Sequence, residues 1–495
     1  MTAQDMIVAE ETLDPADWSE VRALAHRMVD DAIDHVSGVR ARPLWQEMPK
    51  DVRGTFAGPV PRNPQPLEAV YDEIRENLMP YPMGNVHPRF WMWYMGAGNF
   101  TGAVADFLAA IDGSNLGGGN MAAAQVDRQV TDWIRDMMGF PEGASGTLVN
   151  GGSMANIIGL MAARNAMAGV DLRHQGVDVM PQPLRFYASD QVHNCHQKAM
   201  NLLGLGKRAL HRVPSNDAFR LDLGALKTRI RADRYYGERP ACVIATAGTT
   251  NTGAIDDLPA IADLCAEEGL WLHVDGCIGA LIAIAPDHLH LVAGIERADS
   301  LALDLHKGLQ APFDVGCALV RDRKTHRQTF AEDAEYLQKM SRGIAAAEFL
   351  HDYNLDTTRG FRALKIWMML KEHGVAKFGR LIDQGITQAQ YLTGLIARDP
   401  ALEMMAPTVT DVVCFRFNPG GMEEVALRDL NIEIMLQLQE TGIAAVSDTT
   451  VKGRHCLRVA ICNHRTKRAD LELLATEVLR LGASATGPAQ AKRFM

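Results

Sequence analysis

Two charged residues follow strand-like runs in the middle of the sequence. Asp275 comes directly after the apolar run 270–274, and Lys307 comes shortly after the run 300–303. In an open α/β sheet, ligands bind beyond the carboxyl ends of the strands, so these two side chains are expected to meet over one crevice. A lysine there can form an imine with a carbonyl group, and a carboxylate can bind a cationic ring nitrogen. The alternative is a structural ion pair.

Three further motifs favour a ligand over a structural ion pair. Gly152 and Ser153 open an apolar helical pattern, where backbone N–H groups and a hydroxyl can hold a phosphate. Thr246 ends another strand-like run, and His193 follows a third. Each feature alone is also common in structural turns or as a packed histidine. Together, a phosphate cradle, a carboxylate, a flat imidazole and an imine-forming lysine describe pyridoxal phosphate.

In order and spacing, these motifs resemble the pyridoxal-phosphate-dependent group II amino acid decarboxylases over roughly residues 65–480. This family includes the aromatic-L-amino-acid, glutamate and histidine decarboxylases. The resemblance implies that Lys307 is the Schiff-base lysine, that Asp275 pairs with the pyridine nitrogen and that His193 stacks on the ring. It also implies a set of further cofactor-binding residues, which comprises Gly152, Ser153, Thr246, Asp304 and His306.

The same resemblance assigns residues to the substrate. Tyr336, in a charged stretch after the lysine, is similar to the family's catalytic-loop tyrosine, which would return a proton to Cα. Arg359 resembles an arginine that would hold the substrate carboxylate, with Arg362 as the competing choice. Trp93 and Tyr94 lie in a His-Pro-x-Phe aromatic segment and would form the wall of the substrate pocket.

The expected reaction is decarboxylation of an L-amino acid, aromatic or otherwise bulky, to an amine and CO₂. Trp93 and Tyr94 favour an aromatic substrate, whereas the Gly-rich stretch 116–120 replaces aromatic residues of the family and indicates a wider or more polar pocket. Oxidative deamination and carbon–carbon cleavage are alternatives on the same cofactor. A non-catalytic pyridoxal-phosphate-binding regulator is a third alternative, although it calls for a basic DNA-binding extension and the net charge is −10.

The elements that position these residues alternate between strands and helices, which predicts a mainly parallel sheet covered by helices. The expected strands cover residues 185–189, 242–247, 270–274, 300–303, 317–320, 411–417 and 455–461, and the expected helices include 17–38, 261–268 and 375–399. The resemblance implies the aspartate-aminotransferase-like fold type I, with a mixed, mainly parallel seven-stranded sheet in the large domain and a small C-terminal α+β domain. The expected parts are an N-terminal arm for dimerisation (1–100), a large cofactor domain (101–371), a small domain (372–482) and a tail (483–495).

Composition limits the remaining function classes. Hydrophobic residues make up 47% of the 495 residues, which is typical of a globular protein. The negative net charge argues against a nucleic-acid partner, and no apolar stretch is long enough for a membrane span. We see no export signal and expect a cytoplasmic protein. The eight cysteines form no C-x-x-C pair, so reduced thiols and no metal are expected. The resemblance implies a homodimer with the active site at the subunit interface.

Overall fold

The computed structural model describes residues 11–332 and 340–486, which divide into two compact units between Met83 and Gly84. The helices of the first unit are α1 (Trp18–Ser37), α2 (Lys50–Thr55) and α3 (Leu67–Glu73). The Asp17 side chain caps α1 by accepting the Ser19 N–H, and Arg27 of α1 lies 2.9 Å from the Glu68 carboxylate of α3. The helix predicted over residues 17–38 is therefore confirmed.

The second unit contains a seven-stranded sheet in the order β2-β8-β7-β6-β5-β3-β4. Its strands are β2 (Ser145–Val149), β3 (Leu184–Ser189), β4 (Leu210–Val213), β5 (Arg239–Thr246), β6 (Trp271–Asp275), β7 (Ser300–Asp304) and β8 (Gly316–Val320). The pairings among β7, β6, β5, β3 and β4 are parallel, whereas β8 runs antiparallel to both of its neighbours. The expected mixed, mainly parallel sheet is confirmed.

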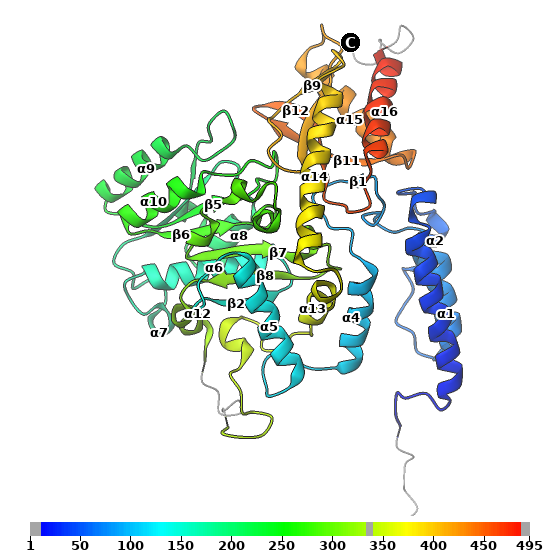
Figure 1. The fold of residues 1–495 in the computed structure, drawn as a ribbon, viewed down its shortest axis with the longest axis horizontal. Helices are drawn as coiled ribbons and strands as arrows, with labels where there is room; N and C mark the ends of the chain where they lie inside the picture. Colours follow the sequence, from blue (N-terminus) through cyan, green and yellow to red (C-terminus); the bar gives the residue numbers. More distant parts are fainter. Residues whose placement is uncertain (1–10, 333–339, 487–495) are drawn as a thin grey trace, which may run out of the picture. The chain divides into compact units, whose positions relative to one another are not determined.

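Both faces of this sheet are buried, because alternate residues of each strand enter different cores. Tyr187 and Val243 pack into one core, and Phe186 and Cys242 pack into the other. The helices of the first core are α5 (Ala122–Met137), α9 (Leu223–Tyr235), α10 (Leu258–Glu268) and α13 (Ala363–His373); those on the opposite face are α6 (Gly152–Met167), α7 (Leu172–Gln175), α8 (Cys195–Leu202) and α12 (Arg323–Phe330). The fold is a helix-covered α/β domain (Figure 1).

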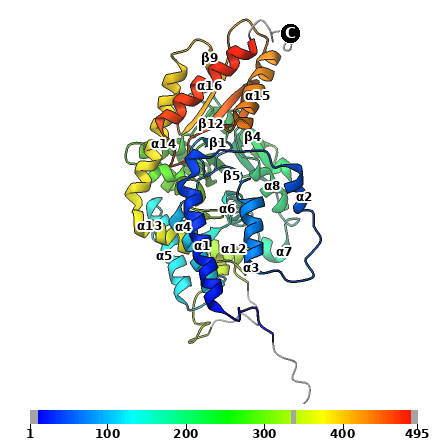
Figure 2. The ribbon, with the colours of Figure 1, turned by 90° about the vertical axis from the view of Figure 1, so that its right-hand side faces the viewer.

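A smaller five-stranded sheet follows the large one, in the order β1-β11-β12-β10-β9. Its elements are β1 (Phe90–Trp91), β9 (Leu402–Met404), β10 (Val412–Phe417), β11 (Ala445–Val451), β12 (Arg454–Ala460), α14 (Val375–Ile396), α15 (Glu424–Glu440) and α16 (Arg468–Thr486). The long helix α14 extends from the level of the large sheet to that of the small one (Figure 1). The helices α14, α15 and α16 gather around the small sheet (Figure 2).

Two boundaries differ from the expected ones. Strand β1 pairs in parallel with β11, so residues 84–100 belong to the second unit and not with the N-terminal segment. The last helix continues to Thr486, past the point where we expected a tail. A two-residue strand that pairs with a strand more than 350 positions away leaves no periodic signal in the sequence, which explains the first difference.

Candidate active site

A cavity of about 630 Å³ lies beyond the carboxyl ends of β5, β6 and β7. These parallel strands end at Thr246, Asp275 and Asp304, so their last side chains reach the same edge of the sheet. The predicted site residues that line the cavity are Trp93, Tyr94, Gly152, Ser153, His193, Thr246, Asp275, Asp304, His306 and Lys307. The fold thus brings together side chains that the sequence separates by more than 200 positions.

Lys307 lies in the short helix α11 (Leu305–Gly308), directly after β7. Its Nζ is 2.9 Å from Asp304 Oδ2 and 5.9 Å from the centre of the Tyr94 ring. Burial alone would lower the pKa of Lys307, but the charge and hydrogen bond of Asp304, together with Cys277 and Asp275, outweigh it and the net pKa is raised. The amine therefore stays protonated at neutral pH and is paired with the Asp304 carboxylate.

Asp275 is held on both carboxylate oxygens. Oδ1 accepts the Cys277 N–H at 3.2 Å, and Oδ2 lies 2.8 Å from Nε2 of His196, in α8. Burial opposes ionisation of Asp275, but the bond and charge of His196 and the contacts with Cys277 together outweigh it, so the pKa of Asp275 lies far below its usual range. The cavity consequently contains a buried, ionised carboxylate suited to a cationic ring nitrogen.

His193 lies between β3 and α8, and its Nδ1 accepts the Cys195 N–H at 3.2 Å. This bond fixes the tautomer of the neutral ring, whose proton is then on Nε2. The contact with Cys195 raises the pKa of His193 against the effect of burial. His193 can therefore donate a hydrogen bond from Nε2 into the cavity that it lines.

The start of α6 fits a phosphate. Gly152 is its first residue, and a Cβ built there would lie 2.3 Å from Cys277 Sγ and 2.7 Å from Asp304 Oδ2, so only glycine allows this approach. Ser153 lines the cavity at the same helix terminus, where backbone N–H groups are free for an anion. Within the described residues, Thr246 Oγ1 is buried without a hydrogen-bond partner. The residues present thus fit pyridoxal phosphate.

Trp93 and Tyr94 form a turn at the mouth of the cavity, with φ angles of 58° and 139°. The Trp93 side chain is 53% exposed, whereas Tyr94 is buried and donates its hydroxyl to Asp411 Oδ2 at 2.8 Å. Burial and the neighbouring Asp411 raise the pKa of Tyr94 well above its ordinary value, so the phenol stays neutral. Together the two rings give the cavity an aromatic wall.

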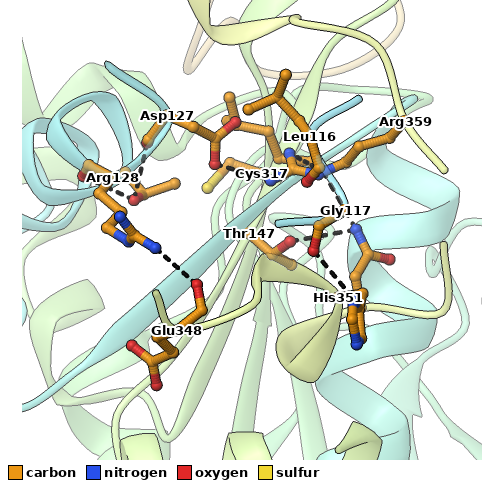
Figure 3. A network of polar contacts seen from close by, with 12 residues as sticks. Leu116, Gly117, Asp127, Arg128, Thr147, Cys317, Glu348, His351 and Arg359 are labelled. Carbon is orange, nitrogen blue, oxygen red and sulfur yellow. Dashed lines mark hydrogen bonds and ion pairs between the residues drawn. The ribbon is translucent and has the colours of Figure 1, made fainter. Parts of the chain in front are cut away.

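Arg359 lies elsewhere, which corrects the expectation that it faces the substrate. Its guanidinium is buried and bonded to Asp127 Oδ1 at 2.8 Å, to the Leu116 carbonyl and to the Leu148 carbonyl (Figure 3). It is not among the residues that line the described cavity. Arg362, the competing choice, pairs with Asp314 at 2.9 Å. Sequence alone does not distinguish a buried structural arginine from a ligand-binding one.

Replacement of Arg359 should therefore affect stability and not substrate binding. In Arg359→Met, Asp127 becomes a buried carboxylate without its ion-pair partner, which costs about 3–5 kcal/mol of unfolding free energy. Chemical denaturation measures this loss, and KM should stay unchanged. A raised KM at unchanged stability would instead indicate that Arg359 binds the substrate carboxylate.

Arg458 of β12 is the cavity residue that sequence reasoning missed. Its Nη1 donates to the Trp93 carbonyl at 2.6 Å and to Ser447 Oγ at 3.4 Å. Nε and Nη2 are buried and have no hydrogen-bond partner among the described residues. The available signal was a charged residue within the apolar run 455–461, because a fully buried arginine is rare. Its two free donor groups fit a carboxylate.

Two other expectations concern Tyr336 and the Gly-rich stretch 116–120. Tyr336 lies outside the described residues. The Gly-rich stretch packs against residues 349–357. A Cβ atom built on Gly117 would lie 2.0 Å from the Thr357 carbonyl oxygen, and one built on Gly118 would lie 2.2 Å from the Phe349 ring. Close backbone approach thus explains these two glycines, and they do not line the cavity.

None of the described helices is both long and apolar enough for a membrane span.

Comparison with known proteins agrees with this geometry. The pyridoxal-dependent decarboxylase conserved domain matches residues 49–418. The chain is 33% identical to an aromatic-L-amino-acid decarboxylase of Bacillus atrophaeus, over 91% of this chain and 93% of the relative. It is 30% identical to a tryptophan decarboxylase of Camptotheca acuminata, over 95% and 96% of the two chains. The crystal structure of Oryza sativa TDC with pyridoxal phosphate and tryptamine is 26% identical, with a TM-score of 0.88 over 96% of this chain and all of that one (100%).

Proposed function

Because the chain belongs to the pyridoxal-dependent decarboxylase family, we propose that it converts aromatic L-amino acids to their amines and CO₂ in the cavity around Lys307. The family membership makes the chain a pyridoxal-phosphate-dependent amino acid decarboxylase. The observation that carries the assignment to this cavity is that Lys307, the ionised Asp275 and the start of α6 all face it. The names of the relatives support the aromatic substrate class.

In this proposal each end of the cofactor has its own residues. Lys307 supplies the amine that attaches it, and Asp304 Oδ2 lies 2.9 Å from Nζ and holds it in place. Gly152 and Ser153 hold the phosphate, Asp275 the ring nitrogen, and His193 the face of the ring. Thr246 and His306 also line the cavity that would hold the cofactor. When bound, pyridoxal phosphate withdraws the electron pair that the departing CO₂ leaves on Cα.

Arg458 takes the role of substrate-carboxylate ligand that was expected of Arg359. Its unpartnered Nε and Nη2 offer a charge-assisted pair of donors, and burial makes such a bond strong. The aromatic wall of Trp93 and Tyr94 packs against the side chain of the substrate. Holding the carboxylate and the side chain at once sets the direction of the Cα–carboxylate bond relative to the cofactor ring.

Arg458→Met should raise KM by about 10- to 100-fold, the value of a lost hydrogen bond to a charged group. Steady-state kinetics on the best substrate measures this effect, and Arg458→Lys should recover part of it because it restores the charge. Ser447→Ala is the matched control, since it removes the 3.4 Å contact from Arg458 Nη1 and the Ser447 hydroxyl bond to the Arg458 carbonyl but keeps the guanidinium. Unchanged KM in Arg458→Met would contradict the assignment.

Tyr336 remains our proposal for the group that returns a proton to Cα after CO₂ leaves. Oxidative deamination is not favoured, because the relatives that match over most of their length are named decarboxylases. The similarity to a Rhodiola rosea 4-hydroxyphenylacetaldehyde synthase, at 22% identity and a TM-score of 0.85, reflects the shared fold.

A panel of L-amino acids tests the substrate class. Tryptophan, tyrosine and phenylalanine are compared with glutamate and histidine, and amine, aldehyde and hydrogen peroxide are all measured. We expect kcat/KM for at least one aromatic substrate to exceed that for glutamate by about 10²-fold or more, because an apolar wall rejects a second carboxylate. Turnover of glutamate alone would refute the aromatic assignment, and aldehyde with peroxide would favour the oxidative alternative.

A homodimer is also part of the proposal. Helix α4 (Phe100–Asp112) packs one face on α13 and carries exposed apolar residues on the other, including Phe107 at 61% and Ile111 at 72% exposure. In the first unit, α1 buries none of its residues, although Val29 and Ile33 are apolar. Apolar faces of this kind are typical of self-association.

A cytoplasmic location, supported by eight free thiols, also remains a proposal.

The dimer is tested on α4. Phe107→Glu combined with Ile111→Glu should weaken the dimer by at least about tenfold, because two carboxylates would lose water at the interface. Sedimentation equilibrium measures the dissociation constant. Tyr235→Glu, at an exposed aromatic position of α9, is the control. Wild-type protein that stays monomeric would contradict the proposal.

A further inference from the structure

We propose that His196 is a positioning residue, which holds Asp275 ionised and in one orientation for the nitrogen of the cofactor ring. The inference rests on the proposed function, in which Asp275 meets that nitrogen. His196 does not line the cavity, so it acts through Asp275 and not on the substrate.

The contact is short and fully buried. His196 Nε2 lies 2.8 Å from Asp275 Oδ2, and the imidazole has no solvent exposure. The other carboxylate oxygen accepts the Cys277 N–H at 3.2 Å. One bond comes from helix α8 and the other from the turn after β6, so together they prevent rotation of the carboxylate. Asp275 still lines the cavity and keeps lone pairs free for a ligand.

The other basic side chains near Asp275 are engaged with different partners. The ring of His273 is 6.2 Å from that of His196, but both of its nitrogens are engaged, with Ser300 Oγ and Asn156 Oδ1 at 2.8 Å each. Burial lowers the pKa of His273 to about 3, so this ring is neutral. Lys307 pairs with Asp304.

The His196–Asp275 pair is therefore the charged contact that fixes Asp275. Burial alone would lower the pKa of His196, yet the hydrogen bond and charge of Asp275 together with the contact to Cys195 outweigh it and raise the pKa to about 10. Without a donor on Oδ2, a carboxylate this deeply buried takes up a proton more readily. A neutral acid no longer stabilises a positive charge on the ring nitrogen.

The test follows the ring nitrogen directly. The apoprotein is loaded with pyridoxal phosphate labelled with ¹⁵N in the ring, and its ¹⁵N resonance is recorded together with the dissociation constant of the cofactor. In His196→Leu we expect the resonance to move from the pyridinium toward the neutral pyridine position, and the dissociation constant to rise at least about tenfold. His196→Gln places an amide donor near Nε2, so its resonance should stay close to that of the wild type.

The matched control is His273→Leu, which removes an equally buried imidazole that does not contact Asp275. Circular dichroism confirms that each variant is folded. A merely structural role for His196 predicts the same resonance in both leucine variants. That result would overturn this inference but leave the proposed function intact. A wild-type resonance at the neutral position would overturn the Asp275 assignment, and the inference with it.

Discussion

Lys307→Ala should abolish covalent attachment of the cofactor and reduce decarboxylation by about 10³-fold or more. The loss is large because in our proposal Lys307 is the amine that attaches pyridoxal phosphate, and no other lysine lines the described cavity. The measurement is mass spectrometry of the borohydride-reduced holoprotein, which locates the cofactor on a peptide, combined with CO₂ release.

The matched control for Lys307→Ala is Lys365→Ala. Lys365 is also buried, and it pairs with Asp106 at 2.9 Å, but it does not line the cavity. This variant should lose stability yet keep the covalent cofactor. If the reduced wild-type protein carried the cofactor on a lysine other than Lys307, the assignment of the site would be wrong.

Asp275→Asn should leave the cofactor attached but slow turnover by about 10²- to 10³-fold, as expected when one preorganised electrostatic contact is removed. An amide has the shape of the carboxylate but not its charge, so the ring nitrogen loses the anion that keeps it protonated. The expected loss is therefore in kcat, with a smaller change in KM, and single-turnover kinetics separates the two.

The control for this second prediction is Asp256→Asn. Asp256 is also a buried acid near the cavity, but its carboxylate accepts the Leu221 and Thr246 N–H groups, and burial raises its pKa to about 6. Asp256→Asn should affect stability more than kcat. An Asp275→Asn enzyme with wild-type kcat would show that another group protonates the ring.

The sequence predicted those residues whose positions follow from strand ends. Thr246, Asp275 and Lys307 each come at or just after the end of a parallel strand, and parallel strands deliver their carboxyl ends to one edge of the sheet. The proximity of these three residues can therefore be predicted from the strand pattern of the sequence and from the fold class. The roles of these residues remain proposals, although the structure places them in one cavity.

The residues that the sequence did not place depend on contacts between distant segments. Arg458 reaches the cavity because β12 of the small sheet packs close to the Trp93 turn, which no periodicity encodes. Arg359 follows a motif that fits a ligand role, yet Asp127 of α5 engages its guanidinium. His196 differs from an ordinary core histidine only through Asp275, 79 positions away.

The most direct test of the account uses carboxyl-labelled tryptophan and tyrosine with the purified holoprotein. Labelled CO₂ and the corresponding amine are measured in the same reaction. The account predicts one CO₂ per amine from at least one of these substrates, no aldehyde or peroxide, and loss of both products in Lys307→Ala. Products that persist in Lys307→Ala, or a cofactor-loaded wild-type protein that releases no CO₂ from either amino acid, would contradict it.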